Sequence, residues 1–286
     1  MRRGTRRATK GLHRRPGRFR SLRLVVTTLV VLVVAGPITG SDQIIVAHAD
    51  AAPSRPGLPM ARFPWQGIPA RDTLHTVIER MTRNDPGSGL YTYVHVQRFT
   101  LEASQGRPPA TTEEIALWRA ADGSGAIAVG SRPAPLTEYG PGQLAATFGY
   151  PAAKVENLAG QFHYYSKALG YRLPELVAIM YSQQCLTGAQ RAATLQILAD
   201  TNGLFYLGRV EDRQGRSGLA FSLPGKDQQG RSVRDILIFD ETRGELLSYE
   251  QEATVMPATS PARTPAVLSY VLYLGCGYTD HLGQTP

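Results

Sequence analysis

The two cysteines, Cys185 and Cys276, are the residues whose spacing has the clearest chemical consequence in this chain. A disulfide between them would close a loop of about ninety residues, which the chain-entropy model values at about 4 kcal/mol of folding free energy. Such bonds persist in oxidising, extracytoplasmic compartments. We expect this disulfide, and the alternative is two buried thiols that pack as small apolar groups.

The six histidines show no arrangement that is typical of a metal site or of a hydrolase motif. No two of them stand four residues apart, and there is no H-E-x-x-H sequence. We therefore expect no metal, no cofactor and no enzymatic activity. The alternative is an envelope hydrolase whose site is assembled from distant residues, with His95, His163 or His281 as the candidate base.

Two pairs of adjacent carboxylates, Glu211-Asp212 and Asp240-Glu241, are further groups that could do acid–base chemistry. Both pairs fall in short links between predicted strands. Acidic residues in such links are mostly exposed to solvent. We interpret them as solvated turn charges and not as a catalytic pair.

Aromatic side chains on predicted strands could line an apolar groove for a ligand. The candidates for this groove are Tyr91, Tyr93, Trp118, Tyr270 and Tyr273. A curved sheet with an aromatic face has the composition of a pocket for a lipid or a peptide. The alternative is that each of these residues packs against its cross-strand neighbours, as most aromatic residues in strands do.

The elements that must position these residues are helices followed by a run of strands. A strand is predicted at 90–100 from strict alternation, and a hairpin at 114–130 from Asp-Gly and Ser-Gly in its turn. Helical spacing covers 72–81, 152–169, 173–184 and the segment after Thr187. Five strands follow, at 204–211, 216–223, 232–239, 245–253 and 266–274, with mostly short links that join antiparallel neighbours. The predicted class is α+β, with a curved antiparallel sheet and a C-terminal meander packed on helices.

The formal net charge of +8 is concentrated at the N-terminus. Residues 1–23 hold ten Lys or Arg and no acidic residue, which leaves 21 basic against 23 acidic residues in the remainder. Because an apolar segment follows this arm, attraction to anionic lipid headgroups explains the charge. We therefore expect the membrane, and no nucleic acid, as the partner of the arm.

Residues 24–41 carry no charge, and as a helix they would span about 27 Å, close to the thickness of a bilayer's hydrocarbon core. The basic arm before them should stay in the cytoplasm, so we expect a single-pass protein of the cell membrane with its C-terminal domain outside. The alternative is a signal segment that is cleaved near Ala49, in the small-x-small sequence Ala47-His48-Ala49, to release a secreted protein.

Four parts are therefore predicted along the chain. They are a basic cytoplasmic arm (1–23), a transmembrane anchor or signal core (24–41), a Pro-rich tether (42–71) and an extracytoplasmic α+β domain (72–286). Five prolines between residues 51 and 69 favour extended polyproline geometry in the tether.

Four short motifs, at 117–125 (LWRAADGSG), 190–195 (QRAATL), 210–216 (VEDRQGR) and 239–247 (FDETRGELL), resemble an uncharacterised group of actinobacterial membrane-anchored proteins. These proteins are often encoded beside extracytoplasmic-function sigma factors. The group is similar to the curved half-barrel of periplasmic lipoprotein carriers. The resemblance implies a binding or sensory domain of the cell envelope that takes a lipid, a peptide or an envelope-protein segment, and it supplies no catalytic residues. A structural subunit of a membrane complex is a further alternative.

Overall fold

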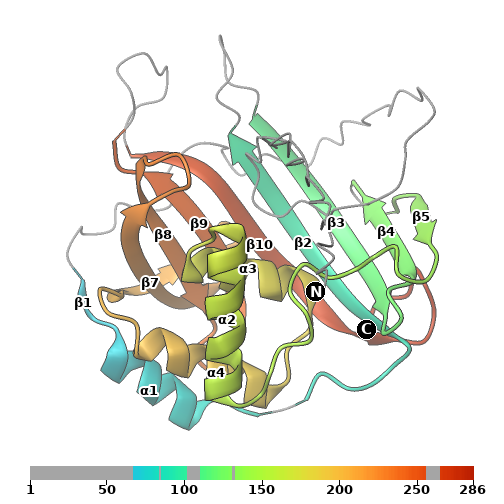
Figure 1. Ribbon diagram of the computed structural model, residues 1–286, viewed down its shortest axis with the longest axis horizontal. Coiled ribbons are helices and arrows are strands. Elements are labelled where there is room, and N and C mark those ends of the chain that lie inside the picture. The colour runs from blue at the N-terminus through green and yellow to red at the C-terminus, as the bar shows by residue number, and fades with distance from the viewer. Residues whose placement is uncertain (1–66, 84, 102–109, 131–132, 256–264) are drawn as a thin grey trace, which may run out of the picture.

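The computed structural model describes residues 67–83, 85–101, 110–130, 133–255 and 265–286, which form one sheet with helices on one face (Figure 1). The arm 1–23, the segment 24–41 and residues 42–66 of the tether lie outside the described residues, so the expectations for them stay predictions. Within the described part of the chain, no helix is long and apolar enough to cross a membrane.

Ten strands pair antiparallel in the order β1-β6-β7-β8-β9-β10-β2-β3-β4-β5. The strands are β1 (Ile68–Pro69), β2 (Tyr91–Leu101), β3 (Ala110–Ala120), β4 (Gly125–Val129), β5 (Leu136–Tyr139), β6 (Phe205–Glu211), β7 (Ser217–Lys226), β8 (Ser232–Phe239), β9 (Leu246–Ala253) and β10 (Ala266–Thr279). The helices are α1 (Arg71–Arg80), α2 (Val155–Leu169), α3 (Leu173–Gln183) and α4 (Gly188–Ala199). The α+β class with a curved antiparallel sheet is confirmed, and β6 to β10 form the predicted meander.

Besides shifts of a few residues at the ends of β3 and β7, three strands differ from the prediction. The last strand, β10, continues beyond the predicted end at Leu274 to Thr279, because Gly275 and Gly277 hide its alternation while its ladder with β2 continues. The short strand β5 was not predicted, since four residues carry too little periodicity. The sheet also begins at Ile68, inside the segment that the sequence assigns to the tether, because β1 pairs with β6.

Local sequence explains where the central helices begin. At the start of α3, the Glu175 carboxylate accepts a hydrogen bond from the Arg172 backbone N–H at 2.7 Å. At the start of α4, the Thr187 hydroxyl accepts from the Gln190 backbone N–H, and the Gln190 side chain accepts from the Thr187 N–H. The single bond at α3 and the reciprocal pair at α4 satisfy amides at the helix starts that would otherwise be left without partners.

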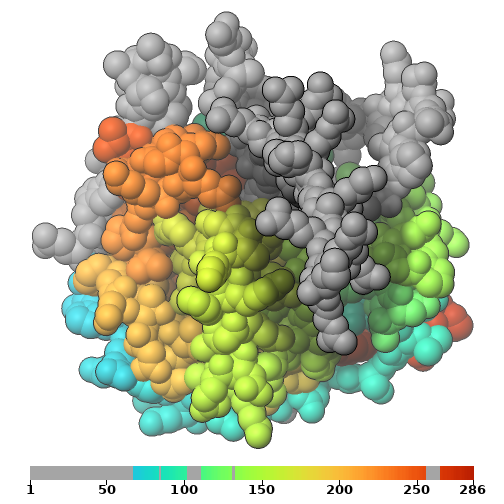
Figure 2. All heavy atoms as spheres, viewed as in Figure 1, coloured from blue at the N-terminus to red at the C-terminus, as the bar shows by residue number. Residues whose placement is uncertain are grey.

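Helix α3 fills the concave face of the sheet. Ten of its eleven residues are buried, and it lies against β2, β8, β9 and β10. Helix α2 packs on α3, and α4 packs on α2 and on α1. Figure 2 shows the same side with all atoms, where α2 lies beside the β7–β8 connection; the Gln228 amide in that connection donates to the Leu169 carbonyl at the end of α2. The helices and the sheet therefore share one apolar core.

A buried polar network ties the start of α3 to β8 and β9. Arg172 forms an ion pair with Asp235, whose side chain is fully buried. The Tyr249 hydroxyl donates to Asp235 at 3.0 Å, and the Gln251 amide donates to both Asp235 and Glu175 at 3.2 Å. Since buried charges are costly unless they are paired, these contacts hold α3 at one position on the sheet.

Replacing Asp235 should destabilise the fold strongly. Asp235→Ala leaves the Arg172 guanidinium without its carboxylate in a mostly buried site, so we expect the free energy of unfolding to fall by about 3–5 kcal/mol. The matched control is Glu241→Ala, which removes a partner of Arg209 from an exposed ion pair and should leave stability nearly unchanged. Urea unfolding measures both variants, and an equal loss in the two would contradict this account.

The charge of Glu175 should make stability depend on pH. Burial holds the pKa of Glu175 above its ordinary value of 4.5, although hydrogen bonds from Arg172 and Gln251 act against the shift. Since the folded chain binds this proton more tightly, its contribution to stability is present below pH 4.5 and is lost as the pH rises through the raised pKa.

Glu175→Gln carries no charge to bury, so its free energy of unfolding relative to the unmodified chain should rise from pH 4.5 into the neutral range. Urea unfolding at a series of pH values checks this difference. A difference that is constant or falls with pH would show that Glu175 does not titrate in this way.

Candidate functional site

The sheet splits between β9 and β10. Their pairing ends at Ser248 and Leu272, whereas β10 stays paired with β2 as far as Thr279. A register irregularity lies between Tyr273 and Gly275. From Tyr273 to Thr279, the edge of β10 on the β9 side therefore has no strand partner among the described residues.

Arg216 bridges this split. Its guanidinium donates to the Tyr273 carbonyl on β10 at 2.6 Å and to the Leu247 carbonyl on β9 at 2.8 Å. The same group is held by the carboxylate of Asp212, whose side chain is fully buried, at 2.6 and 2.8 Å. The two strands thus diverge around one arginine, which satisfies a carbonyl from each of them.

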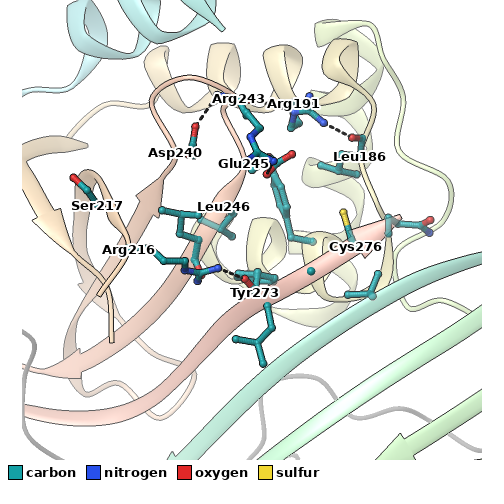
Figure 3. A pocket seen from close by; sticks show the side chains of 16 residues that line it. Leu186, Arg191, Arg216, Ser217, Asp240, Arg243, Glu245, Leu246, Tyr273 and Cys276 are labelled. Atoms are coloured by element: carbon teal, nitrogen blue, oxygen red, sulfur yellow. Dashed lines mark hydrogen bonds and ion pairs between the residues drawn. The ribbon is translucent and has the colours of Figure 1, made fainter. Parts of the chain in front are cut away.

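A pocket of about 520 Å³ opens at the split (Figure 3). Its walls come from the end of α3 and the residues after it, from α4, from the start of β7, from the β8–β9 turn and the start of β9, from β10 and from one residue of β2. The lining residues are Val94, Tyr181, Gln184, Leu186, Arg191, Arg216, Ser217, Asp240, Arg243, Glu245, Leu246, Leu247, Tyr273, Leu274, Gly275 and Cys276. A volume of this size, with mixed polar and apolar walls, is typical of a binding pocket.

The structure joins Cys185 and Cys276 by a disulfide in the wall of this pocket. Cys185 follows α3 and is buried, whereas Cys276 lies in β10 and is exposed. Arg191, which is buried, donates to the Leu186 carbonyl at 2.6 Å and to the Arg243 carbonyl at 2.9 Å. Together these contacts connect the helix layer, the β8–β9 turn and β10 around the pocket.

The two tyrosines of the pocket are suited to binding and not to acid–base chemistry. Burial raises the pKa of both Tyr181 and Tyr273 well above the ordinary value of 10. The Tyr181 hydroxyl donates to the Gly244 carbonyl at 3.2 Å, and that of Tyr273 donates to the Ala178 carbonyl at 2.8 Å. Both phenols therefore stay protonated at physiological pH and hold the backbone around them.

The four carboxylates that the sequence analysis interprets as turn charges differ in their exposure and in their partners. Glu211 is exposed and Glu241 pairs with Arg209 near the surface. Asp212 differs from the interpretation as a solvated charge, because its carboxylate is buried against Arg216. Burial raises the pKa of Asp240, but hydrogen bonds from the Thr242 side chain and from the turn backbone outweigh it and lower that pKa below its ordinary value. Asp240 therefore stays ionised and stabilises its own turn.

The aromatic candidates do not meet in one groove. Tyr91, Tyr93 and Trp118 lie on the face of the sheet away from the helices, where the Trp118 indole donates to the Gln284 carbonyl at 2.6 Å. Tyr270 stacks on Phe99 with ring centres 5.0 Å apart.

Among these aromatic candidates, only Tyr273 faces the helices and lines the pocket. Tyr270 and Tyr273 stand three positions apart on β10, so their side chains point to opposite faces of the sheet.

The candidate histidines lie apart from one another and from the pocket. His95 on β2 pairs with Glu114 at 2.7 Å, His163 is exposed on α2, and His281 is exposed after β10. Over the residues that the structure describes, no group of three or more His, Cys, Asp or Glu side chains could hold a metal ion.

The pocket arginines were missed by sequence reasoning. Arg216 and Arg243 stand in or next to glycine-containing sequences that predict turns. Such sequences do not predict which groups the arginine side chains will contact. Arg216 bonds to Tyr273, 57 positions along the chain, so its role depends on the fold and has no local signature.

Solved structures were found that are similar to this chain at low scores. MucB, in complex with MucA(peri), matches with a TM-score of 0.29 at 13% identity over 72% of this chain, which spans 55% of that structure. A LolA-superfamily protein from Nitrosomonas europaea matches with a TM-score of 0.22 at 11% identity, over 77% of this chain and 96% of that one.

A putative outer membrane lipoprotein-sorting domain from Vibrio parahaemolyticus matches with a TM-score of 0.22 at 10% identity, over 71% of this chain and 90% of that one. No family model matches the chain. No curated protein matches it either. At these scores the similarities carry no functional argument, and the function is argued from the residues of this chain.

Removing the disulfide should destabilise the domain. Cys276→Ser opens a loop that joins positions 91 apart, so we expect a loss of about 2–5 kcal/mol in the free energy of unfolding. Denaturant unfolding of the variant checks this, and the unmodified chain in reductant should show the same loss. Alkylation of two thiols in the unreduced, unfolded chain would contradict the bond.

Proposed function

We propose that this chain is a binding domain of the cell envelope, and that its binding site is the pocket at the split between β9 and β10. The observation that carries the proposal is the pocket itself, in which three arginines, two tyrosines and exposed backbone of β10 surround about 520 Å³. A small number of polar groups in a partly apolar cavity is what gives a site orientation and specificity.

The concave face of the sheet favours this location over a groove for acyl chains. In the half-barrel carriers that the sequence resembles, the ligand would lie between the sheet and the helices. Here that space holds the buried side chains of α3, including Leu176, Ile179 and Met180. A partner is therefore expected at the end of the sheet, where the core opens at the split.

Binding is supported better than catalysis at this site. Four of the titratable pocket groups have close structural partners: Asp240 accepts from its own turn, Tyr181 and Tyr273 donate to backbone carbonyls, and Arg216 is held by Asp212. The Glu245 carboxylate lies 3.5 Å from the Arg243 guanidinium. No described histidine lines the pocket. These contacts hold the walls of the pocket in place. A general base would instead need a free lone pair within hydrogen-bond distance of a substrate proton.

Membrane tethering and a link to a sigma-factor response belong to the same proposal. The apolar segment 24–41 behind a basic arm supports tethering with the domain outside. The resemblance of the motifs at 117–125 and 239–247 supports the regulatory link. A domain on such a tether would report the presence of an envelope partner by binding it.

A photo-crosslinking amino acid at Gln184, inside the pocket, tests the proposed function in native cells. We expect irradiation to increase the mass of the chain by one defined partner or ligand. The matched control is the same group at Tyr164, which is 66% exposed on α2 and outside the pocket. No adduct at Gln184, or the same adducts at both positions, would contradict the pocket as the binding site.

A further inference from the structure

We propose that the edge of β10 at residues 274–278 binds an extended acidic peptide segment of a partner protein, which adds to the sheet as a strand inside the split. This inference rests on the proposed function and names the class of ligand. An added strand gains main-chain hydrogen bonds from the edge and side-chain contacts from the pocket walls.

The edge has the geometry that strand addition needs. Among the residues that the structure describes, β10 pairs between Tyr273 and Thr279 with β2 on one side only. Alternate backbone groups of a strand point to opposite sides. The neighbouring strand β9 begins at Leu246 and has left the ladder there. Leu246 and Leu247 instead line the opposite wall of the pocket, so the space between the two strands is the pocket.

The edge is also open to a ligand. Gly275 and Cys276 are exposed, although β10 is buried from Ala266 to Tyr273. A methyl group added at Gly275 would meet nothing within 4 Å, whereas Gly277 is buried and a methyl group there would meet Pro286 at 2.5 Å. The open part of the edge is therefore at Gly275 and Cys276. Natural sheets protect their edges with charges, prolines or covering segments. The sequence Leu274-Gly275-Cys276-Gly277-Tyr278 holds no charged residue and no proline.

The charges around the split favour an acidic peptide. Arg191, Arg216 and Arg243 line the pocket together with the carboxylates of Asp240 and Glu245. Arg216 is already paired with the buried Asp212, so the preference for an acidic peptide rests on Arg243. Asp240 is engaged by its own turn. Arg243 is 63% exposed and its contact with Glu245 is long, at 3.5 Å. A ligand carboxylate can therefore take the place of Glu245 on Arg243 with the planar, two-pronged geometry that a guanidinium offers.

The fold allows this arginine to be tested without disturbing the wall of the pocket. The Arg243 backbone carbonyl, and not its side chain, accepts the bond from Arg191. Replacing the Arg243 side chain therefore leaves the contact between the β8–β9 turn and α4 in place. Arg209 on β6 is 58% exposed and pairs with Glu241. It is a matched control outside the pocket.

The test uses the full chain and a fluorescent five-residue peptide that alternates valine and glutamate. We expect saturable binding by fluorescence anisotropy, together with slower hydrogen exchange of the backbone amides in residues 274–278. Arg243→Gln should weaken binding about tenfold, the effect of losing one charged hydrogen bond. Glu245→Gln should strengthen it, because the competing carboxylate is gone, and Arg209→Gln should change nothing.

Two altered peptides make the inference falsifiable. A peptide with lysine in place of glutamate should bind at least about tenfold more weakly, and one with alternate backbone nitrogens methylated should lose the protection of residues 274–278. Equal binding of the lysine peptide would overturn the acidic specificity. Binding without protection of these amides would overturn strand addition. Absence of binding while the Gln184 crosslink forms would overturn this inference and leave the proposed function standing.

Discussion

Helix α3 lies with ten of its eleven residues buried against the concave face of the sheet, and the other elements are arranged around that contact. Its start is held by the Arg172–Asp235 ion pair, its middle by the Tyr273 hydroxyl on the Ala178 carbonyl, and its end by the disulfide that follows it. Apolar burial supplies the driving force, while these directional contacts select one docking position. A curved sheet that could enclose a ligand is thereby filled by the protein's own helix.

Filling the concave face has a consequence for where a ligand can bind. The buried core covers β8, β9 and β10 as far as Tyr273. The pocket therefore lies where β9 and β10 separate. Arg216 stabilises that separation, since it satisfies one carbonyl from each strand and is neutralised by the buried Asp212. The pocket is therefore built from structural contacts that also leave one stretch of strand edge exposed. The same few residues stabilise the split and support the proposal that it is the binding site.

The sequence predicted the meander and the central helices, because alternation, helical spacing and turn glycines are local properties. The continuation of β10 through Gly275 and Gly277 was not predictable in this way, since those glycines carry no pattern and only the ladder with β2 holds them in a strand. The disulfide between Cys185 and Cys276 was expected from their number and the expected compartment, with two buried thiols as the alternative, and the structure shows the bond. The pocket could not be predicted, because Arg216 meets Tyr273 only after the sheet has formed.

The central claim is that the helix-covered face is closed to acyl chains and that binding takes place at the split. Photoactivatable palmitic acid, added to the full chain and mapped by mass spectrometry after irradiation, tests this claim most directly. We predict no adduct within Leu173–Gln183 or on strand residues of the core beneath the helices, such as Phe221 and Leu237. Saturable labelling of those residues would show that an acyl chain enters between α3 and the sheet, and would contradict the account.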